Sequence, residues 1–542
     1  MGKIYAVSCK KTDDEGRGIV VFNGSTFSVP FLMDGEKGMI SLVYGRNQTG
    51  ARLEEVTKES PDRVAPPCPY YMQCGGCDMM HMNYSKQLAV KKQHVLNVLD
   101  KRIASDRPEV EDIVPSEHPL GYRNKIHNTY GKDNGKVVSG LYMGNTHKLM
   151  SLPEGCQIEN AAAKEVLKTI RDFANGKHIR IYDEDRRTGV LRHVLIRVAS
   201  NGDMMVVPVI GENIFPEKHA LADTIVRKHP FVKTVVLNYN SAATTMVLGK
   251  KEEVLYGPGY ISETLCGCEF RISPRSFFQV NKEQTEKLYG KAMEMAAIRP
   301  DERVVDAYCG TGTIGILAAK MEEKATVTGV ELNADAVRDA KSNAERNQIS
   351  NAEWICADAG EYLQGAAARK EQVDVLFMDP PRSGSTPQFL KAVRSIAPKR
   401  IVYISCNPDT LARDLDILGR SYRLTRVCPV DMFSQSHHVE TVVLLSKLRE
   451  AKHHVSVTLD MDEMDLTSAE SKATYEEIKK YVAEHNDGMK VSSLNIAQVK
   501  VKYGIIEREN YNKAKSEEAR QPVCPKDKEE AIVEALKAFR MI

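Results

Sequence analysis

Hydrophobic and polar positions divide the chain into stretches of different periodicity. In residues 16–31 and 37–56, apolar and polar residues alternate between glycines, which predicts short strands joined by tight turns. Four prolines in residues 61–70 then interrupt any regular element. We therefore predict a small β-barrel over residues 1–60.

The next stretch, residues 61–265, has a mixed pattern. Residues 84–104 show the apolar spacing of a helix with a basic outer face. Further along, the pattern predicts a helix over 160–175 and strands over 191–199, 203–210 and 234–240. This indicates a central α/β domain that has no nucleotide-binding loop of its own.

From residue 266 to 450 short apolar strands alternate with helices. The predicted strands 304–308, 326–332, 373–379 and 400–406 are separated by helical segments such as 313–321 and 334–347. Such alternation predicts a parallel sheet with right-handed crossovers. The stretch closes with strands 422–430 and 437–448, whose connection is too short for a crossover helix. Residues 451–542 are charged and helical in pattern, which indicates an appended small domain.

Composition narrows the class of protein. The 542 residues are 42% hydrophobic and 27% charged, which excludes a disordered or collagen-like chain. The net charge is only +2, so any nucleic-acid site must come from local basic surface. No apolar run approaches the roughly 18 residues of a membrane span, and the first residues lack a secretory pattern. We expect a cytoplasmic protein, in which the 12 cysteines are metal ligands, nucleophiles or core residues.

A glycine-rich loop follows the strand 304–308. Gly310, Gly312 and Gly315 have the spacing G-x-G-x-x-G at the start of a predicted helix, which lets backbone N–H groups approach a ligand. Glu331 ends the next strand, where a carboxylate can bind two ribose hydroxyls. The pattern suits NAD and S-adenosylmethionine equally.

Two further strand ends carry chemistry. One strand ends in Asp379-Pro-Pro-Arg382, and another ends in Cys406-Asn-Pro. Ligands of open parallel sheets bind beyond the carboxyl ends of the strands, so both motifs are predicted to face the crevice of the glycine loop. A hydride-transfer enzyme needs neither motif. Cys406 also precedes a predicted helix start, which is expected to lower its thiol pKa.

A cysteine, a base and a methyl donor in one crevice can methylate uracil. Uracil C5 is a poor nucleophile until a thiolate adds to C6, and a base must afterwards remove the C5 proton. Glu440 begins the last predicted strand and is the candidate base. A solvated loop carboxylate is the alternative interpretation of Glu440.

Five motifs in order resemble the S-adenosylmethionine-dependent RNA uracil-5-methyltransferase family: FRISPRSFFQVN (270–281), DAYCGTG (306–312), DPPR (379–382), SCNPDTLARD (405–414) and HHVETVVLL (437–445). The likeness is greatest to the bacterial 23S ribosomal RNA enzymes. It implies a Rossmann-like class I methyltransferase sheet. It extends back to residue 1, where the predicted barrel resembles a TRAM domain, an OB-type RNA binder, and it stops near residue 450.

The resemblance implies a role for each matching residue. Cys406 is the implied nucleophile and Glu440 the implied base. Phe277 stands where the family places a ring against a flipped uracil, and Gln279 contacts the same base. The residues implied in cofactor binding are Gln279, Tyr308, Gly310, Gly312, Glu331, Asp358 and Asp379.

Cys68, Cys74 and Cys77 have the spacing C-x5-C-x2-C in a proline- and glycine-rich loop, which predicts a metal site. Three close cysteines with one distant ligand suit a cubane iron–sulfur cluster better than structural zinc. From the residues alone, the fourth ligand is open among Cys9, Cys156, Cys266 and Cys268. The resemblance selects Cys156 and implies a [4Fe–4S] cluster.

The expected partner is RNA, with 23S ribosomal RNA favoured over tRNA, and we expect a monomer without membrane attachment. Basic residues in 122–125 and 186–193 can grip phosphates, although solvated charged faces explain each stretch equally well. Two other classes stay open: a non-catalytic iron–sulfur RNA-binding protein and, more weakly, an NAD oxidoreductase.

Overall fold

Two separate units make up the structure, which is a computed structural model. The units comprise residues 1–450 and 451–542. The residues that the structure describes are 3–44, 49–102, 108–144, 146, 148–244, 246–448, 475–486, 488–503 and 524–539.

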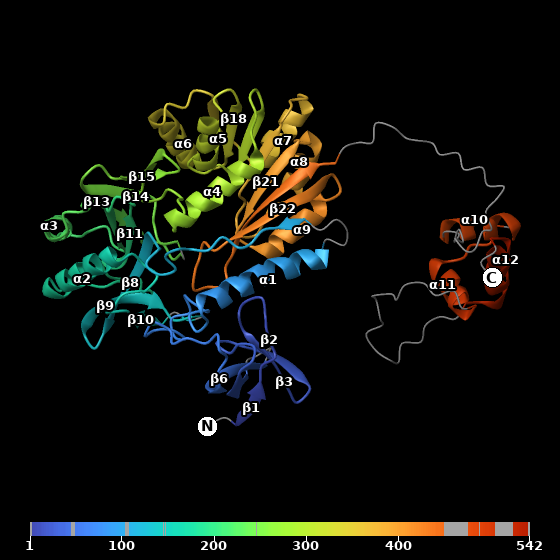
Figure 1. Cartoon of the computed structure of the whole chain (residues 1–542), viewed down its shortest axis with the longest axis horizontal. Coiled ribbons are helices and arrows are strands. Elements are labelled where there is room, and N and C mark those ends of the chain that lie inside the picture. Colours follow the sequence, from blue (N-terminus) through green and yellow to red (C-terminus); the bar gives the residue numbers. More distant parts are fainter. Residues whose placement is uncertain are drawn as a thin grey trace. The chain divides into compact units, whose positions relative to one another are not determined.

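An eight-stranded sheet carries the motifs of the catalytic region (Figure 1). Its order is β19-β18-β17-β20-β21-β23-β22-β7, and the first five strands are parallel, as the alternation predicted. Strand β23 runs antiparallel to both β21 and β22. The strands are β7 (Glu109–Val110), β17 (Arg303–Ala307), β18 (Thr326–Glu331), β19 (Ala352–Cys356), β20 (Val375–Met378), β21 (Arg400–Ser405), β22 (Tyr422–Val430) and β23 (Glu440–Lys447).

Helices cover both faces of this sheet, which gives a three-layer α/β/α arrangement (Figure 1). One face carries α4 (Lys282–Ala296), α5 (Thr313–Met321) and α6 (Ala334–Arg346). The other carries α7 (Ala359–Ala368), α8 (Pro387–Ile396) and α9 (Pro408–Leu418), and α1 (Tyr84–Arg102) packs on α9. Helix α1 and strand β7 come before residues 125–272 in the sequence, yet they pack in the catalytic region. The chain therefore contributes to the catalytic region first and forms the central part of the fold afterwards.

The central part is a seven-stranded sheet of order β10-β9-β8-β11-β12-β13-β14. Only β12 and β13 are parallel, and α3 connects them. One face of this seven-stranded sheet shares a core with the catalytic region, because Leu195 and Met205 pack in one cluster with Phe270 and Leu288. The elements are β8 (Lys125–Asp133), β9 (Lys136–Tyr142), β10 (Leu149–Ser151), α2 (Ala161–Gly176), β11 (Leu191–Val198), β12 (Met204–Ile210), α3 (Lys218–Lys228), β13 (Val232–Tyr239), β14 (Lys251–Tyr256) and the hairpin β15 (Ile261–Leu265) and β16 (Cys268–Ile272).

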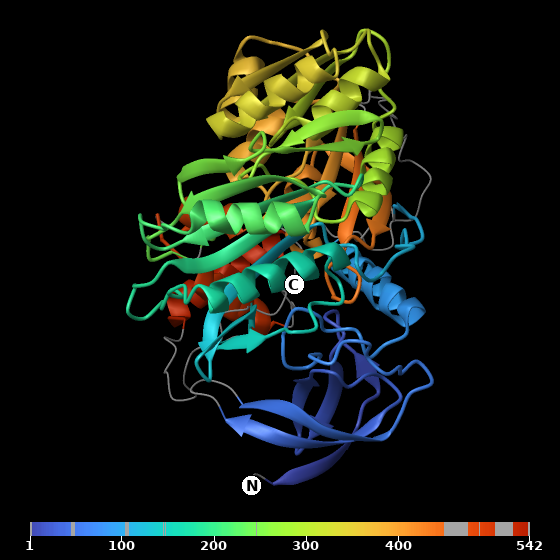
Figure 2. The same ribbon diagram turned by 90° about the vertical axis from the view of Figure 1, so that its left-hand side faces the viewer.

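The N-terminal residues form two three-stranded antiparallel sheets, β1-β5-β6 and β2-β3-β4 (Figure 2). Cys9, Val20, Val29, Leu32 and Ile40 are the buried centre between them. The strands are β1 (Ile4–Ser8), β2 (Lys11–Thr12), β3 (Gly18–Phe22), β4 (Ser25–Val29), β5 (Lys37–Tyr44) and β6 (Thr49–Lys58). The alternation of apolar and polar residues in this region therefore correctly predicted short strands.

The described residues of the second unit form three helices, α10 (Tyr475–His485), α11 (Ser493–Lys502) and α12 (Lys526–Ala538). They pack around Ile478, Val482, Ile496, Ile532 and Leu536. In the described part of the chain, no helix combines the length and the apolarity needed to cross a membrane.

Candidate active site

The glycine loop lies between β17 and α5. Gly310 and Gly312 have φ angles of 54° and 82°, the left-handed region in which glycine avoids a steric penalty. The Glu331 carboxylate at the end of β18 accepts N–H bonds from Gly310 at 3.2 Å and from Asn333 at 2.8 Å. These bonds orient Glu331 at the loop, where the sequence predicted a ribose-binding acid.

A buried carboxyl lies beneath this loop. Asp306 is the second-to-last residue of β17. Its Oδ2 accepts the Gly315 N–H at 2.8 Å, while its Oδ1 has no partner among the described residues. Burial raises the pKa of Asp306 to about 8, with smaller contributions from Asp379 and Glu331. Sequence reasoning missed Asp306, although it stands in the DAYCGTG motif.

Two other predicted cofactor residues line the same edge. Tyr308 is half-buried, and its ring lies 4.9 Å from that of Phe389 between centroids. Asp358 caps α7, where its Oδ1 accepts N–H bonds from Gly360 and Glu361 at 2.9 and 3.0 Å. The cap gives Asp358 a structural role that is independent of any ligand.

Strand register brings the candidate nucleophile and base together. Ser405 of β21 pairs with Thr441 of β23 in an antiparallel ladder, so the next positions, Cys406 and Glu440, stand opposite each other. Glu440 is buried and Cys406 is half-buried. Asp379 follows the neighbouring strand β20 and is near enough to raise the pKa of both groups.

The thiol pKa differs from the expectation drawn from the helix start. Helix α9 does begin at Pro408, with Asn407 as its cap. The pKa of Cys406 is nevertheless raised to about 11, by burial first and then by Glu440 and Asp379, while Arg382 lowers it. The prediction of a lowered thiol pKa was wrong, because burial and two carboxyls outweigh one helix terminus.

Glu440 is an unusual carboxyl. Burial raises its pKa to about 8, and Asp379 adds to the effect while Arg382 opposes it. Burial also raises the pKa of Asp379 to about 7. A carboxyl with a pKa near neutrality suits general-base chemistry, and Glu440 is not the solvated loop carboxylate of the alternative interpretation.

A pocket of about 330 Å³ opens above Cys406. Arg382 lies on its wall, and its Nη2 is 2.7 Å from Nδ1 of His438. The pKa of His438 is lowered to about 4 by burial, His437 and Arg382, so the imidazole is neutral and accepts this bond. The lining residues are Gly76, Tyr122, Arg123, Ile158, Arg382, Cys406, Phe433, Ser436 and His438.

The loop 273–281 presents Phe277 and Gln279. Phe277 is 66% exposed. The buried guanidinium of Arg197 donates to the carbonyls of Pro274 and Ser276, and Asn124 donates to that of Gln279. Sequence reasoning missed Arg197, because its contacts are about eighty residues away in the chain.

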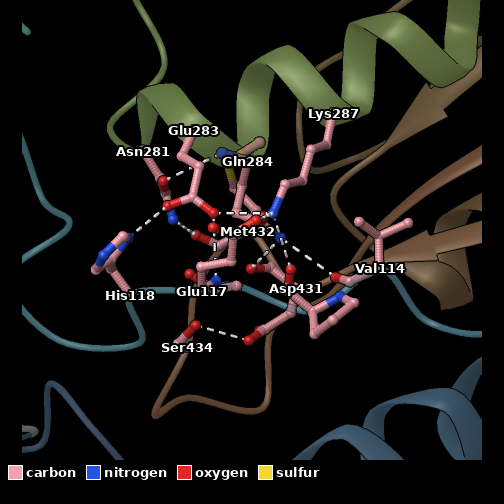
Figure 3. Close-up of polar contacts among 12 residues, drawn as sticks. Val114, Glu117, His118, Asn281, Glu283, Gln284, Lys287, Asp431, Met432 and Ser434 are labelled. Atoms are coloured by element: carbon pink, nitrogen blue, oxygen red, sulfur yellow. Dashed lines mark hydrogen bonds and ion pairs between the residues drawn. The ribbon is translucent and has the colours of Figure 1, made fainter.

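Residues 431–439, here called the catalytic loop, connect β22 to Glu440 (Figure 3). Residues 437–439 were predicted as the start of the last strand, which begins instead at Glu440, and no role was predicted for residues 431–436. Asn281, the N-cap of α4, and Gln284 of α4 donate to the carbonyls of Met432 and Asp431, each at 3.1 Å. The Asp431 carboxylate forms a fully buried ion pair with Lys91 of α1. The root of the catalytic loop is therefore anchored from two helices.

The four predicted metal ligands line one cavity of about 380 Å³, which is also lined by Arg123, Lys125 and His127. Burial and the neighbouring cysteines raise the thiol pKa of Cys77. Within the described residues, no three His, Cys, Asp or Glu side chains are arranged to hold a single metal ion. The cysteines are Cys68, Cys74, Cys77 and Cys156.

The two basic stretches differ. Arg123 lies on the wall of both the cysteine cavity and the pocket above Cys406. In the second stretch Arg192 is buried and bonds Glu184, so it supports the fold instead of facing solvent.

Residues 246–448 match the family model described as tRNA (Uracil-5-)-methyltransferase. An uncharacterised RNA methyltransferase of Oceanobacillus iheyensis is 39% identical over 447 residues, which cover 82% of this chain and 96% of the relative. The chain belongs to the RNA uracil-5-methyltransferase family. An uncharacterised RNA methyltransferase of Clostridium tetani is 37% identical over 441 residues, which cover 81% of this chain and 95% of that relative.

The family is also seen in solved structures. The Pyrococcus abyssi tRNA (uracil-54, C5)-methyltransferase, in complex with S-adenosyl-L-homocysteine, has a TM-score of 0.65 and 26% identity. The match covers 81% of this chain and 100% of that chain. This protein is accordingly an S-adenosylmethionine-dependent RNA methyltransferase with the α/β fold of that class.

Proposed function

We propose that this enzyme forms 5-methyluridine in 23S ribosomal RNA through a covalent adduct between Cys406 and uracil. The observation that carries the proposal is the register of β21 and β23, which pairs Ser405 with Thr441 and so sets Cys406, on the wall of the pocket, opposite the buried Glu440. The cytosol is the expected site of this reaction.

In the proposed reaction the Cys406 thiolate adds to C6 of a flipped uracil, and the electron pair of the C5–C6 bond moves toward C5 and O4. Bound S-adenosylmethionine would supply an electrophilic methyl group: C5 bonds to this carbon as the methyl–sulfur bond breaks, and the electron pair stays on the sulfur of the leaving S-adenosylhomocysteine. Glu440 then takes the C5 proton, the C5–C6 double bond re-forms, and the C6–S bond breaks to release the thiolate. The Cys406 thiol must first give up its proton to form the thiolate, and Glu440 passes the C5 proton to solvent before the next turnover.

Other residues bind and orient in this proposal. Glu331 is oriented to accept hydrogen bonds from ribose hydroxyls, and Gly310 and Gly312 keep the loop backbone open to the cofactor. The direction in which a Gly310 side chain would point is free of other atoms within 4 Å, which fits a ligand in contact with the backbone. Tyr308, Asp358 and Asp379 complete the cofactor side, and Phe277 and Gln279 contact the base.

The RNA substrate can be tested directly. Purified enzyme with methyl-labelled cofactor is expected to label a 23S ribosomal RNA transcript and not unmodified tRNA, with 5-methyluridine as the product in a nuclease digest. Transfer of label to tRNA alone would instead assign the enzyme to the tRNA branch, whose solved relative from P. abyssi acts on uracil-54. Mapping of 5-methyluridine in RNA from cells with and without the gene then locates the site.

We propose in addition that Cys68, Cys74, Cys77 and Cys156 hold a [4Fe–4S] cluster. The four thiols share one cavity, and the same cavity is lined by the cations Arg123 and Lys125, which suit an anionic cluster. A single zinc ion needs Zn–S distances of about 2.3 Å and hence sulfurs within about 4 Å of one another. The four irons of a cubane hold their thiolates farther apart than a single ion does, so the iron, sulfide and zinc contents of the protein distinguish the two kinds of site. The bound cluster would cross-link residues 68–77 to Cys156.

Protein purified without oxygen is expected to be brown, with iron and sulfide in nearly equal amounts. Cys77→Ser is expected to lose the visible absorbance, while Cys266→Ser, which changes an exposed cysteine outside the cavity, retains it. Colourless protein that contains zinc would contradict the cluster.

A further inference from the structure

The pocket above Cys406 has two walls from distant parts of the chain. Phe433, Ser436 and His438 of the catalytic loop form one wall. Gly76 forms part of the other, and it belongs to residues 74–79, here called the cysteine segment. The separation of these walls decides how a flipped base fits over the thiol.

Hydrogen bonds join the two walls directly. The Asp78 and Met79 N–H groups both donate to the Gln435 carbonyl at 3.1 Å. The Asp78 Oδ2 carboxylate oxygen lies 2.6 Å from Nδ1 of His437. Asp78 therefore contacts the catalytic loop through its backbone and its side chain at once.

The tip of the catalytic loop adopts a conformation that needs support. Gln435 has a φ of 73°, in the left-handed region that residues other than glycine avoid. Its side-chain carbonyl accepts from Gln87 of α1, and its N–H donates to the Gln87 side chain. Together with the bonds from the cysteine segment, these contacts hold the tip in place.

The side chain of Asp78 acts on the tip and not on the root of the loop. Asn281 and Gln284 bind the carbonyls of Met432 and Asp431 at the root (Figure 3). Lys91 binds the Asp431 carboxylate there, and none of these bonds involves Asp78. At the tip, the His437 ring packs against that of His438 at 4.2 Å between centroids. His438 in turn accepts the bond from Arg382 beside Cys406.

We propose that Asp78 is a positioning residue for the reaction at Cys406, which acts by fixing His437 and thereby the His438 wall of the pocket. The inference rests on the proposed covalent reaction. Since Asp78 directly follows Cys77, it also links the predicted cluster to the catalytic loop through one residue.

The test measures the rate of adduct formation with 5-fluorouridine RNA, in which fluorine replaces the C5 proton and traps the methylated adduct. Asp78→Ala and His437→Ala are each expected to slow the adduct about tenfold at saturating RNA, with unchanged cofactor affinity. The double variant is expected to be no slower than either single variant, because both changes remove the same contact between Asp78 and His437. Asp78→Asn, which keeps an oxygen acceptor, is expected to restore most of the rate.

Asp112→Ala is the matched control, since Asp112 pairs with Lys92 of α1 but its side chain is 97% exposed, and it should keep the wild-type rate. Metal content is measured for every variant. Full activity of Asp78→Ala, multiplicative losses in the double variant, or losses that follow loss of metal would overturn the proposal. If wild-type protein forms no adduct, the proposed function fails before the variants are compared.

Discussion

Replacement of Cys406 by alanine is expected to abolish both methyl transfer and the covalent adduct with 5-fluorouridine RNA. Without the sulfur no bond forms at C6, so C5 stays too electron-poor to accept a methyl group. Because Cys406 lies beyond the strand end and outside the sheet core, the variant should fold and bind S-adenosylmethionine normally. We expect a fall in turnover of at least about a thousandfold, in the range found when a nucleophile is removed from an active site.

The matched control is Cys356→Ala. Cys356 ends β19, the edge strand on the far side of the parallel part of the sheet; it is exposed and lies outside the pocket. It should retain wild-type turnover and adduct yield in a denaturing gel. Adduct formation by Cys406→Ala would remove the thiol from the mechanism, and loss of cofactor binding in that variant would indicate a structural role instead.

Local patterns predicted the elements that place the site. The alternation of strands and helices identified β17, β18, β20 and β21, and parallel strands bring their carboxyl ends to one edge. The positions of Glu331, Asp379 and Cys406 at these ends follow from that rule alone. That Cys406 stands opposite Glu440 depends in addition on the antiparallel register between β21 and β23, which no local sequence pattern specifies.

What the sequence did not predict depends on long-range contacts. The pairing of β7 with β22 joins residues more than three hundred positions apart, as does the ion pair between Lys91 and Asp431. The wrong sign for the Cys406 pKa has the same origin. A helix start can be seen locally, whereas burial and the approach of Glu440 arise only from the assembled sheet.

Glu440→Gln is expected to form the covalent adduct on ordinary uridine RNA and then release it very slowly. The amide cannot accept the C5 proton, so the methylated intermediate accumulates while turnover falls by about a hundredfold to ten-thousandfold. Mass spectrometry of the adduct should show the added methyl group. Rapid release of 5-methyluridine by this variant would exclude Glu440 as the base, and another group would have to take the proton.

In the Glu440→Gln variant the Cys406 thiol should also become more reactive. A purely structural defect would not raise the reactivity of this thiol. The Glu440 carboxylate raises the Cys406 pKa, and a neutral amide removes that charge, so the pKa falls and the thiolate fraction at a given pH rises. Alkylation of Cys406 by iodoacetamide at pH 9, where Glu440 with a pKa of about 8 is largely ionised in the wild type, should therefore be faster in the variant. Glu353→Gln, at an exposed position of β19, should leave the alkylation rate unchanged. Slower alkylation of Glu440→Gln would mean that the carboxyl does not act on the sulfur, even though strand register sets the two side by side.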